Sequence, residues 1–268
     1  MGPSDETLVD ELRVVGAVAS PPEVGPGEAV TLDVTIVDPE AEGVDLLVWA
    51  CTPTGDGCVE DALPLVDRLA APEVEDGQGQ AILTVPGGPL PADVSIPSAV
   101  WLLACEPGLC PIIELAAQAL ESGSELPDAL RDPIGLLQDL PLQGVSLASR
   151  TVVVSGRPVE ERNTNPTVTL TSGVPLEIPA EGTLDLPLEI ADSTAPDGLD
   201  AVGLATAGGF SAPLFDILDG RADLVFFAPE GEGEVELYVV VEDGLGGSAL
   251  WRGTATVQES ENSEPTED

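Results

Sequence analysis

The chain has 268 residues and a formal net charge of −41, because 49 acidic residues stand against only eight basic ones. All eight basic residues are arginine, and the chain contains neither histidine nor lysine. This excludes a histidine-dependent catalytic triad, a P-loop lysine and a Schiff-base lysine. Such a negative field repels nucleic acid and anionic lipid headgroups, whereas a hydrophobic content of 43% is ample for folded cores.

Alternating apolar residues predict the strands of the first half. Val30, Leu32, Val34 and Ile36 alternate with polar residues, which places one strand face in a core and the other in water. Further strands bounded by turn residues are predicted at Leu12–Ala19, Asp45–Cys51, Gln80–Val85, Ala99–Cys105 and Val145–Ser155.

Four cysteines, Cys51, Cys58, Cys105 and Cys110, fall in two close pairs. An even number in a strand-rich chain predicts disulfides and therefore an oxidising compartment. A zinc site with four thiolates is the alternative, but separations of seven and five residues miss the usual C-x2-C to C-x4-C spacing on at least one side. Local pairs, Cys51 with Cys58 and Cys105 with Cys110, compete with a bridge between strands.

Two tryptophans accompany these cysteines. Trp49 and Trp101 each precede a cysteine by an even number of residues and therefore share a strand face with it. We expect both to pack beside disulfides in the first core. Exposed rings that bind sugars are the alternative, which the small number of aromatic residues disfavours.

The segment 111–140 departs from the strand pattern. Ile112, Leu115, Ala116 and Ala119 stand at helical spacing, and prolines occupy places where short helices begin. We expect a helical insertion that caps an open edge or end of a sheet. A lid or groove for a partner is the alternative.

The second half repeats the pattern of the first. Residues 22–48 and 175–204 both run from a proline-rich entry through an acidic-glycine turn into an alternating strand. In this repeat Asp192 corresponds to Asp38, and Asp200 corresponds to Asp45. Later strands are predicted at Thr167–Thr171, Val202–Ala207, Ala222–Ala228, Gly233–Val241 and Ser248–Val257.

About seven short strands in each half predict an all-β chain of two tandem immunoglobulin-like β-sandwiches, the first with a short helical insertion. The predicted domains are an N-terminal tether (1–10), a first sandwich (11–158) with its insertion at about 111–140, a second sandwich (159–258) and a disordered acidic tail (259–268).

The second half, with "NTNPTVTL", "AGGF" and "VEDGLGGSA", resembles bacterial surface immunoglobulin-like domains of the PKD and cadherin-like kind. The first half, beginning "LRVVGAVASPPEVGPGEAVTLDV", resembles the leading module of envelope lipoproteins, and "MGPSDETLVDEL" resembles a mature lipoprotein whose acylated cysteine has been replaced. The resemblance implies a location in the cell envelope or outside the cell, with a lipid anchor on the native N-terminus. Its partner would be an envelope or extracellular protein.

In such domains a "V-x-D-G-x-G-G" corner links the last two strands, and Val241, Asp243, Gly244, Gly246 and Gly247 match it. A P-loop needs a helix and a lysine after its glycines, whereas a β-rich segment follows here. Glycines also permit the positive φ angles of a tight hairpin. We therefore expect a turn and no phosphate site.

The resemblance also indicates where calcium could bind. Oxygen ligands of the type that calcium prefers would come from Asn163, Asn165, Asp192, Asp197, Asp200 and Asp243. The "NTNP" linker, however, lacks the aspartates of the full cadherin pattern, and Asn and Asp also stabilise turns through their own side chains. The bare turn is the expected alternative.

The leading functional hypothesis is a non-catalytic envelope or secreted protein, structural or adhesive, that requires no cofactor. A calcium-stiffened adhesion module is one alternative. A carboxylate-dependent hydrolase such as a glycosidase is another, because carboxylates are the only catalytic groups in good supply. No residue is assigned a catalytic role.

Overall fold

The computed structural model describes residues 5–39, 43–54, 57–59, 69–70, 72–85, 87–122 and 143–259, with gaps at 172–174, 193 and 195–197, and isolated positions between 130 and 140. The predicted tail beyond residue 259, most of the predicted insertion after residue 122 and Asp197 lie outside the described residues. Within the described residues, no helix is both long and apolar enough to cross a membrane.

The contacts within the chain define two compact units. The N-terminal unit comprises Glu11–Asn165 and Asp243–Ser248, and the C-terminal unit comprises Met1–Asp10, Pro166–Glu242 and Ala249–Asp268. Within the predicted tether at 1–10, residues 5–10 are described, and they include the short 3-10 helix η1 (Asp5–Thr7) of the C-terminal unit.

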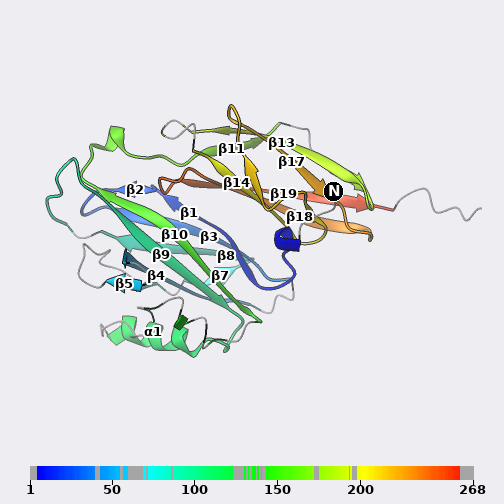
Figure 1. The fold of residues 1–268 in the computed structure, drawn as a ribbon. Coiled ribbons are helices and arrows are strands. Elements are labelled where there is room, and N and C mark those ends of the chain that lie inside the picture. Colours follow the sequence, from blue (N-terminus) through cyan, green and yellow to red (C-terminus); the bar gives the residue numbers. More distant parts are fainter. Residues whose placement is uncertain are drawn as a thin grey trace, which may run out of the picture. The chain divides into compact units, whose positions relative to one another are not determined.

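Two sheets build the N-terminal unit (Figure 1). The first has the order β1-β3-β8-β7, and the second has the order β2-β10-β9-β4-β5, with β6 also pairing with β4. The strands are β1 (Arg13–Ser20), β2 (Glu23–Val24), β3 (Ala29–Val37), β4 (Asp45–Thr54), β5 (Gly57–Val59), β6 (Leu69–Ala70), β7 (Val74–Glu75), β8 (Gln78–Thr84), β9 (Ser95–Cys105) and β10 (Val145–Ser155).

Two further sheets build the C-terminal unit, in the orders β11-β13-β17-β15 and β12-β19-β18-β14-β16. The segment between β10 and β11, residues 156–166, is called the linker below, and it contains the 3-10 helix η3 (Val159–Glu161). The strands are β11 (Thr167–Leu170), β12 (Leu176–Pro179), β13 (Thr183–Ala191), β14 (Asp200–Ala205), β15 (Gly209–Phe210), β16 (Leu214–Asp216), β17 (Arg221–Phe227), β18 (Gly233–Glu242) and β19 (Ser248–Gln258).

The two units share most of one strand order. If the strands of each unit are lettered along the chain, both have A-B-E in one sheet and A′-G-F-C in the other, as in an immunoglobulin fold. The edge strands differ: in the N-terminal unit the earlier edge strand, β5, pairs with C and the later one, β7, with E, whereas in the C-terminal unit the earlier edge strand, β15, pairs with E and the later one, β16, with C. In both units the short A′ strand pairs in parallel with the last strand, β2 with β10 and β12 with β19. The sequence repeat also holds at single positions, because Asp45 and Asp200 are the first residues of the two equivalent C strands.

Each unit buries apolar residues from both of its sheets in one core. In the N-terminal unit the core includes Val30, Leu32 and Leu83 from one sheet and Val48, Leu102 and Val152 from the other. In the C-terminal unit it includes Leu186, Leu224 and Phe226 from one sheet and Ala201, Val239 and Val257 from the other. The period-two alternation of β3 and β13 therefore marks the core-facing residues, as the sequence predicted.

A second apolar cluster lies on the opposite face of the β4–β9–β10 sheet. Trp49 and Leu103 from the strands meet Ile113 and Ala116 of the helix α1 (Pro111–Ser122), which follows β9 in the chain (Figure 1). The indole Nε1 of Trp49, itself 1% exposed, donates a 3.0 Å hydrogen bond to the carbonyl of Leu130. The helix thus covers a sheet face, and not the edge or end that we expected from the sequence.

This cluster corrects the expected place of the tryptophans. Trp49 stacks on Trp101 at 6.3 Å between ring centroids, and it packs in the cluster that contains the Cys105–Cys110 disulfide. The neighbouring inward residues Val48 and Leu102 belong to the core between the sheets. Trp49 therefore packs beside a disulfide, but outside the sandwich core.

The position of α1 can be tested with the same substitution at two adjacent helix residues. Ala116 is 0% exposed and Leu115 is 54% exposed. Ala116→Asp should lower the free energy of unfolding by about 3 kcal/mol or more, because it buries an unpaired charge. Leu115→Asp should change it by only about 0.5 kcal/mol. Urea unfolding followed by tryptophan fluorescence measures both, and equal effects would show that α1 does not pack through Ala116.

Candidate functional site

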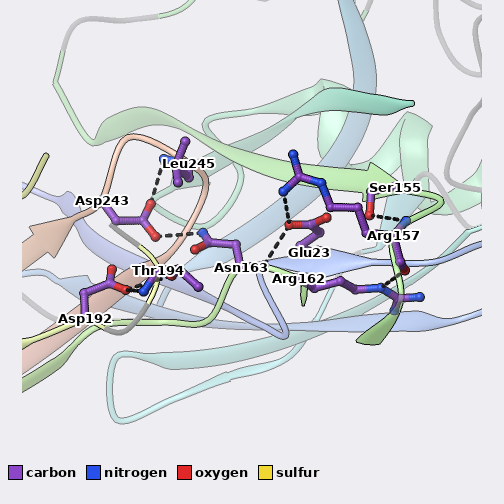
Figure 2. A network of polar contacts seen from close by, with 9 residues as sticks. All are labelled: Glu23, Ser155, Arg157, Arg162, Asn163, Asp192, Thr194, Asp243 and Leu245. Carbon is purple, nitrogen blue, oxygen red and sulfur yellow. Dashed lines mark hydrogen bonds and ion pairs between the residues drawn. The ribbon is translucent and has the colours of Figure 1, made fainter. Parts of the chain in front are cut away.

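The loop of residues 243–247 connects β18 to β19, and a single carboxylate organises it. Asp243 is 2% exposed. Its Oδ1 accepts a hydrogen bond from the backbone N–H of Leu245 at 2.7 Å, and its Oδ2 accepts one from Asn163 Nδ2 at 2.7 Å (Figure 2). The backbone N–H of Gly247 also donates to Oδ1, at 2.8 Å. The carboxylate thus satisfies three donors, two of which belong to its own loop.

The glycines of this loop have separate roles. Gly244 and Gly246 have φ angles of 68° and 102°, a region that side chains disfavour. A Cβ on Gly247 would lie 2.2 Å from Asp243 Oδ2, so that glycine permits the close approach of the carboxylate. The Asp243 N–H donates to the Gly247 carbonyl at 3.1 Å, and β19 follows directly. The loop is therefore a tight turn between strands, as predicted, and no helix follows to form a phosphate cradle.

Asn163 and Asn165 hold the same loop from the linker. Asn163 is 5% exposed and donates to Asp243 as described above. Asn165 Oδ1 accepts from the Ser248 N–H at 3.0 Å, and its Nδ2 donates to the Ala19 carbonyl at 2.7 Å. Both amides therefore bind backbone or carboxylate groups of the fold.

Glu23, which no sequence motif marks, is as enclosed as Asp243. Its side chain is 2% exposed, and its Oε2 accepts a 2.8 Å hydrogen bond from the Asn163 N–H. Arg157 Nη1 lies 3.7 Å from the same oxygen, while Oε1 is buried without a hydrogen-bond partner (Figure 2). The guanidinium offsets part of the cost of burying this charge.

The sequence repeat does not identify Glu23. Val24 and Ile178 each precede the first residue of the next strand, Ala29 or Thr183, by five positions, so Glu23 corresponds to Glu177. Glu177 is exposed. Only the linker residues Arg157 and Asn163, which contact Glu23 from far along the chain, make the two positions different.

A second acid–arginine pair lies nearby in sequence. Glu28 Oε2 accepts from the backbone N–H of Gly25 at 2.9 Å and from Arg162 Nη1. The hydrogen bond from Gly25 and then the Arg162 guanidinium lower the pKa of the Glu28 carboxyl, against the opposing effect of burial. Arg162 Nε also donates to the Arg157 carbonyl at 3.0 Å, which connects the two pairs.

Two other predicted calcium ligands, Asp192 and Asp200, have no contact with Asp243 among the hydrogen bonds described above. Asp192 Oδ1 accepts from the N–H and the hydroxyl of Thr194, both at 2.7 Å, as in an Asx turn. Asp200 is an exposed residue at the start of β14. Among the residues that the structure describes, no three acidic or cysteine side chains gather in a geometry that could hold a metal ion.

Of the four predicted disulfide cysteines, Cys105 and Cys110 are bonded to each other. This is the local pairing, and it joins the last residue of β9 to the residue that precedes α1. The side chains of Cys51 and Cys58 lie outside the described residues.

No protein-family model matches the chain, and no curated protein matches it significantly. Among solved structures, the titin I-band fragment I67–I69 is 10% identical, with 93% of this chain and 64% of that one covered at a TM-score of 0.29. The D0–D1 domain of intimin is 11% identical, with 90% and 98% covered at 0.27. The Yersinia pseudotuberculosis adhesin InvE is 12% identical, with 90% and 58% covered at 0.24. The immunoglobulin-like assignment rests on the strand order of the two units.

The turn network predicts a large effect of removing one carboxylate. Asp243→Ala leaves three donors without their acceptor and should lower the free energy of unfolding by about 2–4 kcal/mol. Asp200→Ala, at an exposed strand position, is the matched control and should stay within about 0.5 kcal/mol. A double-mutant cycle with Asn163→Ala, measured by urea unfolding, isolates the Asn163–Asp243 bond. A coupling energy of zero would mean that this bond contributes nothing.

The same geometry predicts the response to calcium. Because N–H donors occupy both oxygens of Asp243, we expect calcium to raise the melting temperature no more than magnesium or sodium chloride of equal ionic strength. Thermal unfolding in chelator and then in each salt measures this. A shift specific to micromolar calcium would contradict the expectation and support coordination at the predicted residues.

Proposed function

We propose that this protein is a non-catalytic module of the cell envelope or the extracellular space, in which two immunoglobulin-like units serve as an adhesive or accessory spacer. The observation that carries the proposal is the strand order A-B-E in one sheet and A′-G-F-C in the other, which both units share. Repeated sandwiches with separate cores present surface while each remains folded. This architecture suits a binding or spacing role.

The Cys105–Cys110 disulfide supports a location outside the reducing cytosol. Its cysteines are 0% and 4% exposed and belong to the apolar cluster under α1. Disulfides of this structural kind persist in the envelope and outside the cell. A lipid anchor on the native N-terminus would attach such a module to a membrane surface.

The contacts of the buried carboxylates favour a structural role over a hydrolase. Asp243 accepts three hydrogen bonds that fix a turn, and Glu23 pairs with Arg157 and the linker backbone. A glycosidase needs two carboxyl groups about 5–9 Å apart beside the substrate, one of them with a raised pKa. The pKa of Glu28 and that of Glu236 are instead lowered, each beside an arginine.

The proposal is tested by location and by activity together. We expect the protein in the envelope or culture fluid of its native cells, with Cys105 and Cys110 resistant to alkylation until a reductant is added. Purified protein should hydrolyse chromogenic glycosides between pH 3 and pH 8 no faster than heat-denatured protein. Turnover that is lost on conservative substitution of two neighbouring carboxylates would favour the hydrolase. Cytosolic protein with reduced cysteines would contradict the envelope assignment.

A further inference from the structure

The first described residues of the chain are part of the C-terminal unit. Leu8 forms a parallel bridge with Ala205, and the Val9 N–H donates to the Ala205 carbonyl at 2.8 Å. The Phe210 N–H donates to Thr7 Oγ1 at 2.9 Å. Thr7 is 0% exposed and Val9 is 1% exposed. The segment Thr7–Val9 therefore adds to a sheet that the rest of the unit builds.

This segment lies at the edge of β14 that pairs with another strand over only part of its length. One edge of β14 pairs with β18 along its full length, from Asp200 to Ala205. On the other edge, β16 pairs only with the three residues Asp200–Val202. Leu8 and Val9 pair at Ala205, beyond the end of β16, and supply the backbone contacts that β16 does not make. An unpaired strand edge readily takes up an extended segment.

The same segment also reaches the opposite sheet. Thr7 accepts its hydrogen bond from Phe210 of β15, which belongs to the other sheet of the unit. Phe210 is fully buried and contacts Phe226 and Phe215 at 5.6 and 6.2 Å between ring centroids. Thr7 thus lies beside these aromatic rings, and its hydroxyl satisfies the buried N–H group of Phe210.

We propose that the edge formed by Ala205 of β14 and Phe210 of β15 is a binding site for a Thr-Leu-Val segment, in which the two residues after the 3-10 helix pair with the edge of β14. The chain's own residues 7–9 fill it here, and the same residues of a second copy can replace them. The same segment of a second copy would make identical contacts, so exchanging segments between copies requires no new kind of interaction. This inference goes beyond the proposed function and does not depend on it.

The charge of the chain sets the condition for exchange. Two copies each with a net charge of −41 repel one another at low ionic strength. The Debye length falls from about 30 Å at 0.01 M salt to about 3 Å at 1 M. We therefore expect copies to exchange their segments at high salt, whereas the chain's own segment occupies the site at any ionic strength.

A labelled peptide of residues 5–12 tests the site in the 268-residue chain at 1 M sodium chloride. Val9→Asp places a charge in the buried position and should release the chain's own segment. The peptide should then bind this variant at least about tenfold more tightly than the wild type, whose site is filled. Asp10→Ala, at an exposed residue of the same segment, is the matched control and should bind as weakly as the wild type. Fluorescence anisotropy measures all three.

Two further measurements make the test decisive. A peptide with Thr7→Ala and Val9→Asp should not bind, and sedimentation at 1 M salt after warming should show dimers of the wild type that Val9→Asp lacks. If Val9→Asp loses its β-sheet circular dichroism, Val9→Ala replaces it in the same assay. A folded variant that binds the peptide no better than the wild type overturns the proposal. Equal binding of both peptides, or dimers that persist in the variant, also overturns it.

Discussion

The burial of both faces of the β4–β9–β10 sheet is the constraint on which the N-terminal unit depends. An immunoglobulin-like sheet normally turns one face to the core and the other to water. Here Val48 and Leu102 face the core, while Trp49 and Leu103 on the alternate positions form a second apolar cluster. That second face requires a cover, and α1 provides it. The Cys105–Cys110 bond fixes where the cover begins.

Burial imposes a similar constraint on the polar network of the N-terminal unit. Asp243, Glu23 and Asn163 are all at most 5% exposed, so their hydrogen-bonding groups need partners within the fold. Asp243 obtains them from a glycine turn and from Asn163. Glu23 obtains them at Oε2 from Asn163 and Arg157, whereas its Oε1 has no hydrogen-bond partner. Carboxylates held this way by N–H donors and guanidinium groups are poor ligands for a cation, because binding would first break those bonds.

The long strands could be predicted from the sequence because alternation marks a half-buried surface, and Val145–Ser155 was predicted to the residue. The short strands β2, β15 and β16 have two or three residues, too few for a period to appear. The unbroken apolar runs "LLVWAC" and "VWLLAC" could have indicated a sheet buried on both faces. At the site, the turn glycines and Asp243 were identifiable, whereas Glu23 was not, because tertiary contacts alone distinguish it from the exposed Glu177.

The return of the N-terminal segment to the C-terminal unit also affects the order of folding. Thr7 and Phe210 are 203 residues apart in the chain. Closing a loop of that length costs about 2.6 kcal/mol more in chain entropy than closing one of ten residues. Contacts of such high sequence separation form slowly, and folding of the intervening residues 11–165 shortens the part of the loop that is still flexible. During synthesis, then, Thr7 leaves the ribosome 203 residues before Phe210, and its burial has to wait for that partner.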